Sequence, residues 1–138
     1  MRRRPVAILA LAVLALAAAG CSGGDEGAEA IIETVAPADA AALIASSPQG
    51  LVILDVRTPE EFAAGHLAGA VNLDFYAASF ADDLAVLDRL APYVLYCRSG
   101  NRSADAREMM RSMGFLGVTE IAGGINAWVE EGLPVEAP

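Results

Sequence analysis

The sequence is poor in metal ligands and has no lysine at all. It contains one histidine, His66, and two cysteines, Cys21 and Cys97, among 138 residues. Structural zinc and iron–sulfur sites need several clustered cysteine or histidine ligands. One histidine and two cysteines far apart in the chain therefore predict no metal site.

Positive charge is also scarce after the first residues. From Cys21 onward, six arginines stand against eighteen acidic residues, which gives a net charge of −12. Nucleic acids and anionic lipid surfaces are both bound through clustered positive charge. The sequence therefore excludes nucleic acid as a partner, and it excludes direct binding of the domain to an anionic membrane surface.

The chain lacks an apolar run long enough for a transmembrane helix. Residues 5–19 are uncharged, but a helix that crosses a bilayer needs about 20 apolar residues. Arginines at 2–4 precede this run, and small residues followed by Cys21 end it. That order predicts a secretory signal peptide over residues 1–20. The twin-arginine route is disfavoured because the arginines lead straight into Pro5.

The residues around Cys21 resemble the lipobox of bacterial lipoproteins, although Ala18 stands where leucine is commoner. We therefore expect Cys21 to be lipidated, and residues 21–30, rich in glycine and acidic side chains, to form a flexible tether. The protein would then be exported and held to the membrane only through its N-terminal lipid, facing the periplasm or the cell exterior. The alternative is a soluble secreted protein in which Cys21 is unmodified or removed.

Strands and helices alternate from residue 31 onward, and residues 31–138 are predicted to form one domain. Continuous branched apolar residues at 51–54 and 93–96 are typical of strands buried on both faces. Shorter strands are predicted at 31–35, 71–73 and 118–121. Helices are predicted at 37–46, 58–64, 79–90, 103–113 and 125–131. This alternation predicts an α/β fold in which a central parallel sheet of about five strands carries helices on both faces.

Residues 96–103 (YCRSGNRS) join a predicted buried strand to a predicted helix. Ligands bind at the carboxyl ends of the strands in open α/β sheets. Gly100 permits a positive φ, so backbone N–H groups can turn towards one centre. Arg98, Arg102 and the N-terminus of the helix add positive charge there, which favours a thiolate. We therefore predict that Cys97 is a nucleophile rather than an inert buried cysteine.

Four separated segments resemble the rhodanese family and follow the family's order: residues 55–62 (DVRTPEEF), 65–72 (GHLAGAVN), 96–103 (YCRSGNRS) and 123–128 (GGINAW). The resemblance implies a rhodanese-like fold and thiosulfate sulfurtransferase activity without a cofactor. Cys97 would take the outer sulfur of a small-molecule donor such as thiosulfate and hold it as a persulfide. The outer sulfur of the persulfide would then pass to a thiol or to cyanide. A thiol on another protein is also a suitable acceptor.

The resemblance also assigns a binding loop around the cysteine. Its members are Arg98, Ser99, Gly100, Asn101, Arg102 and Ser103. The two arginines are expected to attract the sulfonate of the donor. Outside the loop, Asp55 and Arg57 are expected to form a supporting ion pair, and His66 is expected to scaffold a turn.

Two other functions stay open. In the pattern typical of cysteine phosphatases of the same fold, five residues stand between the cysteine and the arginine. In this sequence, four residues stand between Cys97 and Arg102. The shorter loop favours sulfur over a tetrahedral phosphate. A non-catalytic sulfur carrier or redox-sensing module that serves a membrane partner is the second alternative, which the tether keeps open. The intact cysteine within an arginine-bearing loop favours the enzyme.

Overall fold

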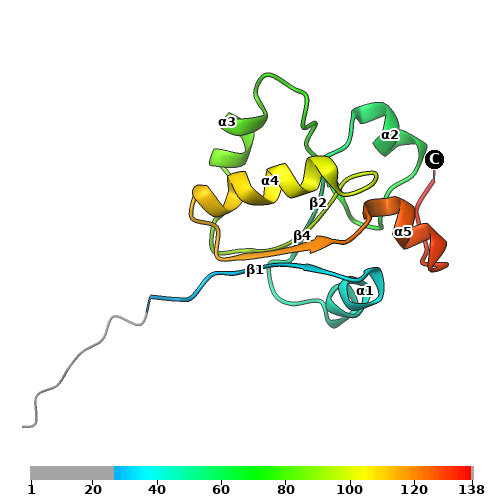
Figure 1. Ribbon diagram of the computed structural model, residues 1–138, viewed down its shortest axis with the longest axis horizontal. Helices are drawn as coiled ribbons and strands as arrows, with labels where there is room; N and C mark the ends of the chain where they lie inside the picture. The colour runs from blue at the N-terminus through cyan, green and yellow to red at the C-terminus, as the bar shows by residue number, and fades with distance from the viewer. Residues whose placement is uncertain (1–26, 138) are drawn as a thin grey trace, which may run out of the picture.

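Five parallel strands form one sheet in the computed structural model, which describes residues 27–137 (Figure 1). The strands are β1 (Ile31–Val35), β2 (Val52–Asp55), β3 (Val71–Asn72), β4 (Pro92–Tyr96) and β5 (Gly117–Ile121). They lie side by side in the order β1-β5-β4-β2-β3, and every neighbouring pair is parallel. The predicted α/β fold with a central parallel sheet of about five strands is confirmed.

Among the described residues, five helices accompany the sheet: α1 (Pro37–Ser46), α2 (Pro59–Ala64), α3 (Phe80–Ala85), α4 (Asn101–Ser112) and α5 (Gly124–Glu130). Side chains of α1 and α5 pack into one buried cluster, and side chains of α3 and α4 pack into another. Figure 1 shows α1 and α4 on opposite sides of the sheet. Helices therefore cover both faces, as the alternation of elements predicts.

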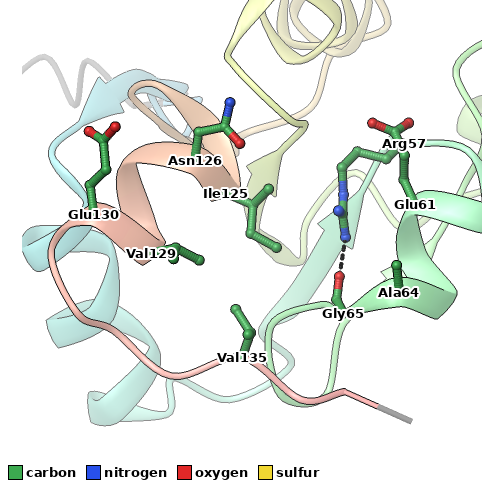
Figure 2. A pocket seen from close by; sticks show the side chains of 9 residues that line it. All are labelled: Arg57, Glu61, Ala64, Gly65, Ile125, Asn126, Val129, Glu130 and Val135. Carbon is green, nitrogen blue, oxygen red and sulfur yellow. Dashed lines mark hydrogen bonds between the residues drawn. The ribbon is translucent and has the colours of Figure 1, made fainter.

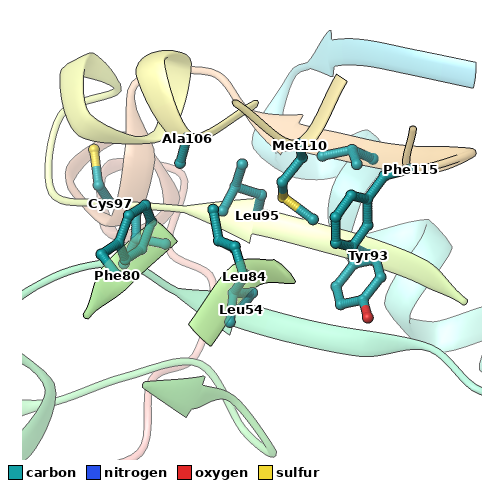
Figure 3. Close-up of a cluster of buried hydrophobic side chains, with 11 residues drawn as sticks. Leu54, Phe80, Leu84, Tyr93, Leu95, Cys97, Ala106, Met110 and Phe115 are labelled. Atoms are coloured by element: carbon teal, nitrogen blue, oxygen red, sulfur yellow. The ribbon is translucent and has the colours of Figure 1, made fainter. Parts of the chain in front are cut away.

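The central strand β4 is apolar throughout because it faces two cores. Along β4, Tyr93 and Leu95 belong to the cluster under α3 and α4, whereas Val94 and Tyr96 belong to the cluster under α1 and α5. Successive side chains of a strand point to opposite faces, so a strand covered on both sides needs apolar residues at every position. Cys97 continues this pattern at one end of the first cluster (Figure 3).

Two helix boundaries differ from the prediction by two residues or more. The helix expected at 79–90 ends as α3 at Ala85, and Val86 and Leu90 are 84% and 75% exposed. Asp88 turns the chain instead: its side chain accepts a hydrogen bond from the Leu90 N–H at 2.9 Å, and its carbonyl accepts one from the Tyr93 hydroxyl at 2.8 Å. Val86 and Leu90 therefore have helical spacing without a core to face, whereas Leu87 packs against the cluster under α3 and α4.

The second difference is at the start of α4. This helix begins at Asn101, two residues before the predicted position 103. Gly100 precedes it with a φ of +106°, a conformation that side-chain-bearing residues rarely adopt. The earlier start matters because it brings the helix N-terminus into the loop that follows Cys97.

The predicted signal peptide, residues 1–20, and Cys21 lie outside the described residues. Residues 27–30 of the predicted tether are described, and they belong to neither a helix nor a strand. Within the described part of the chain, none of the helices combines the length and apolar character that crossing a membrane requires.

Candidate active site

Cys97 lies immediately after β4, at the carboxyl end of the strand in the middle of the sheet. Its neighbours in the core include Phe80 and Ala106, and only 1% of the residue is exposed. In Figure 3 the sulfur points away from the cluster, towards the start of α4. The thiol therefore sits where the apolar core meets a polar loop.

The loop after Cys97 folds back onto the sulfur. The Gly100 N–H donates a hydrogen bond to Sγ at 3.1 Å, and the Ser103 Oγ lies 3.4 Å from the same atom. Gly100 can direct its N–H inward because its φ is positive. Since α4 starts at Asn101, the positive end of the dipole of this twelve-residue helix also lies near the sulfur.

These contacts lower the pKa of the Cys97 thiol. Burial alone raises it, because a thiolate loses solvation in the apolar surroundings. Hydrogen bonds from the Ser103 side chain and from the backbone of Ser103, Gly100 and Ser99 outweigh that effect, and the pKa ends below its ordinary value. The loop therefore stabilises a sulfur anion in a place that otherwise disfavours charge.

Backbone N–H groups at the start of α5 bind the backbone of the loop. The Ile125 N–H donates to the Cys97 carbonyl at 2.9 Å, and the Asn126 N–H donates to the Arg98 carbonyl at 3.1 Å. Gly124 allows this approach: a Cβ there would overlap the Cys97 carbonyl oxygen, and its φ is +61°. The second glycine of the predicted motif at 123–128 thus permits the close contact between α5 and the loop after Cys97.

Arg102 points towards α2 and pairs with Glu61. Its two terminal nitrogens donate to the two carboxylate oxygens at 2.7 and 2.9 Å, and its guanidinium carbon lies 5.4 Å from the ring centroid of Tyr76. This bidentate pairing lowers the pKa of Glu61 from 4.5 to about 2 and raises that of Arg102. Glu61 also accepts from the Thr58 N–H at 3.0 Å, so one carboxylate joins the first turn of α2 to the loop.

Arg98, Ser99 and Asn101 form the exposed part of the loop. Among residues 27–137, the Arg98 side chain takes part in no ion pair or side-chain hydrogen bond. The two arginines of the loop therefore differ in what they offer a ligand. The guanidinium of Arg102 is committed to Glu61, whereas that of Arg98 is open to solvent.

Asp55 and Arg57 lie together at the carboxyl end of β2. Arg57 donates to Asp55 Oδ2 at 2.6 Å and to the Gly65 carbonyl at 2.7 Å, and its backbone N–H donates to Oδ1 at 2.9 Å. This buried pair fixes the turn before α2 to the residues after it. His66 Nδ1 lies 2.9 Å from the Phe62 carbonyl, and the two rings stack at 3.9 Å. The histidine thus packs within the turn.

Ser103 connects Cys97 to a buried carboxylate that sequence reasoning missed. The Ser103 hydroxyl donates to Glu120 Oε1 at 2.6 Å, and Glu120, on β5, is 3% exposed. The sequence did carry a signal, because an acidic residue within the apolar strand GVTEI needs a partner once the strand is buried. Glu61 and Tyr76 are also missing from the predicted site residues.

A pocket of about 390 Å³ lies between α2 and α5, beside residues that contact the loop, although none of residues 97–103 lines it (Figure 2). Its lining joins the groups that hold the loop, since Glu61 binds Arg102 and the Asn126 backbone binds Arg98. The lining residues are Arg57, Glu61, Ala64, Gly65, Ile125, Asn126, Val129, Glu130 and Val135. The mixture of polar and apolar side chains suits a small polar molecule.

Fold and loop together place a buried cysteine, with polar groups around its sulfur, at the carboxyl end of a parallel sheet. Residues 36–131 match the family of the rhodanese-like domain. Thiosulfate sulfurtransferase GlpE of Pseudomonas entomophila is 38% identical to this chain over 94 residues, which cover 68% of this chain and 82% of that protein. The chain therefore belongs to the rhodanese-like domain family.

Solved structures agree with this assignment. The crystal structure of a rhodanese-related protein from Thermoplasma volcanium has a TM-score of 0.67 and 32% identity, covering 77% of this chain and 99% of that one. A protein of unknown function from Rhodopseudomonas palustris, described as a possible tyrosine phosphatase, has a TM-score of 0.60 and 34% identity, covering 76% of this chain and 85% of that one.

The pairing of Glu61 with Arg102 predicts a pH dependence of stability. Because the pKa of Glu61 falls from 4.5 to about 2 in the folded protein, the pair stabilises the fold above pH 4.5 and this contribution is lost as the pH falls towards 2. We expect the free energy of unfolding, measured by urea denaturation, to fall more steeply over that window in the wild type than in Glu61→Gln. Glu60→Gln, at the exposed neighbouring position, should keep the wild-type slope. Equal slopes in wild type and Glu61→Gln would contradict the pairing.

Proposed function

We propose that this protein is a thiosulfate-type sulfurtransferase that carries sulfur as a persulfide on Cys97. The observation that carries the proposal is the loop geometry: a buried thiol with a lowered pKa accepts a hydrogen bond from the Gly100 N–H and lies 3.4 Å from the Ser103 hydroxyl oxygen. In the first step the Cys97 thiolate attacks the outer sulfur of thiosulfate. The S–S bond of thiosulfate breaks, its electron pair leaves with sulfite, and a Cys97–S–S⁻ persulfide forms.

The second step returns the enzyme to its thiolate. A thiolate or cyanide attacks the outer sulfur of the persulfide, and Cys97 leaves with the electron pair of the broken S–S bond. The same donors that lower the pKa of the thiol stabilise this leaving group. Because only 1% of Cys97 is exposed, the acceptor would meet the outer sulfur of the persulfide rather than the cysteine itself. The pocket between α2 and α5 is the proposed site for the acceptor.

The geometry favours sulfur transfer over phosphate hydrolysis. A phosphatase needs its loop arginine to clamp the phosphate oxygens, but Arg102 is engaged by both oxygens of Glu61. The loop is also one residue shorter than the phosphatase pattern. These two features outweigh the likeness to the Rhodopseudomonas protein described as a possible phosphatase.

The proposal includes export and anchoring through a lipid on Cys21, supported by the charged, apolar and small-residue order of residues 1–21. The sulfur chemistry would then take place outside the cytoplasm, on the surface of a membrane.

Replacement of Cys97 tests the activity directly. We expect the full-length protein to form thiocyanate from thiosulfate and cyanide, and Cys97→Ser to fall to the background rate, because serine cannot hold a sulfane sulfur. Cys21→Ser, which removes the other thiol, is the matched control and should keep the wild-type rate. If the wild-type protein shows no turnover, the proposed enzyme activity is wrong and a sulfur-carrier module becomes the better account.

Arg98 is expected to bind the sulfonate of thiosulfate. Arg98→Ala should raise KM for thiosulfate about tenfold with little change in kcat, since one charge-assisted hydrogen bond is lost in both the ground and transition states. Arg98→Lys should recover part of the loss. Arg89→Ala removes an equally exposed arginine before β4 and should leave KM unchanged. An unchanged KM in Arg98→Ala would remove this arginine from the binding site.

Lipidation is tested by labelling. A bacterial host that expresses the full chain and is fed labelled palmitate should give a labelled protein in its membrane fraction. Cys21→Ser should lose the label and Cys97→Ser should keep it. A labelled Cys21→Ser protein, or an unlabelled wild type in the culture medium, would contradict the anchor.

A further inference from the structure

Glu120 is a buried carboxylate for which the sulfur-transfer cycle has no assigned task. Oε1 accepts from the Ser103 hydroxyl at 2.6 Å, and Oε2 accepts from the Thr34 hydroxyl at 2.9 Å and from Arg107 at 2.8 Å. Two elements supply these donors: α4 supplies Ser103 and Arg107, and β1 supplies Thr34. Glu120 itself lies on β5. A charged group that is only 3% exposed is costly to bury. Here the three donors offset that cost, and Ser103 among them lies beside the Cys97 thiol.

The Ser103 hydroxyl has one hydrogen and three acceptors within reach. Glu120 Oε1 is 2.6 Å away, the Gly100 carbonyl 3.2 Å and the Cys97 sulfur 3.4 Å. A distance of 2.6 Å is typical of a hydroxyl that donates to a carboxylate. The shortest of the three contacts therefore assigns the hydrogen to Glu120, which leaves a lone pair of Oγ towards the sulfur. That arrangement suits a thiol, which can donate its own hydrogen to Oγ, and it does not suit a thiolate.

We propose that Ser103 and Glu120 form a hydrogen-bond switch that follows the charge on Cys97. While the sulfur is neutral, as a thiol or as the inner sulfur of the persulfide, the hydroxyl donates to Glu120. When Cys97 becomes a thiolate, the O–H rotates and donates to Sγ. The thiol proton goes to water, so Ser103 and Glu120 gain and lose none. Glu120 keeps Thr34 and Arg107 as donors during the rotation.

The switch gives Glu120 a role as a positioning residue in the proposed sulfur transfer, on which the inference rests. Because the carboxylate competes for the hydroxyl, it holds the thiol pKa above the value that Ser103 alone would produce. When the acceptor takes the outer sulfur, Cys97 departs with negative charge and the hydroxyl becomes available to it. The donor thus acts mainly where charge develops.

Other charged groups around Cys97 stay in place in this experiment. Arg98 belongs to the loop, and Arg102 and Arg107 belong to α4. The Asp55–Arg57 pair ends the neighbouring strand β2, and α3 contributes the apolar Phe80 to the cluster that contains Cys97. None of these is changed below, so differences between variants report on Ser103 and Glu120.

The test measures the pKa of Cys97 from the pH dependence of its alkylation by iodoacetamide. The full chain is used with Cys21→Ala throughout, so that one thiol reacts. Glu120→Gln should lower the pKa by about one unit, because an amide holds the hydroxyl less strongly than a carboxylate. Ser103→Ala should raise it by about one unit, because the thiolate loses a donor.

The double variant separates the switch from a plain effect of charge. In the Ser103→Ala background, Glu120→Gln should shift the pKa by less than half of its effect in the presence of Ser103, because no hydroxyl is left to redirect. An equal shift in both backgrounds would show an effect of charge alone and would overturn the switch. An unchanged or raised pKa in the single variant Glu120→Gln would also overturn it.

Two further variants complete the design. Glu108→Gln removes the exposed carboxylate that lies 3.1 Å from Arg107, without touching Ser103, and it should move the pKa by no more than about 0.2 unit. Glu120→Asp keeps the charge but withdraws it by one methylene from the hydroxyl, so the pKa should again fall; a rise would overturn the switch even if Glu120→Gln does not fold. Alkylation needs no sulfur donor, so absence of turnover would sink the proposed function and leave this inference standing.

Discussion

The structure depends on placing hydrogen-bond donors around a sulfur atom that lies inside an apolar core. Cys97 belongs to the same buried cluster as Leu95 and Phe80, where charge is strongly disfavoured. The chain meets this constraint with a loop whose Gly100 N–H and Ser103 hydroxyl converge on the sulfur. Without that loop, a cysteine in this position would be an inert apolar residue.

Neighbouring elements fix the loop through groups that never touch the sulfur. The first amides of α5 bind the carbonyls of Cys97 and Arg98, and Glu61 on α2 binds Arg102. Two carboxylates thus hold the loop and the first turn of α4. Glu61 precedes the loop in the sequence, and Glu120 follows it. These contacts fix the shape of the loop. Of its two arginines, Arg102 is engaged by Glu61 and Arg98 faces solvent.

Local patterns sufficed for much of the fold. The two-sided burial of β4 is visible in its continuous apolar residues, and the Cys97 loop is visible in its glycine and charges. The end of α3 was not predictable from spacing, because the Asp88 turn decides it. Nor were the pairings of Glu61 with Arg102 and of Ser103 with Glu120, which lie 41 and 17 residues apart and meet only when the strands align.

The central claim is that Cys97 holds a transferable sulfur, and mass spectrometry of the intact protein tests it most directly. After incubation with thiosulfate in the absence of an acceptor, the protein should gain the mass of one sulfur atom. Peptide mapping should place it on Cys97, and cyanide should remove it. A protein whose mass is unchanged, or whose added sulfur lies on another residue, would contradict the account.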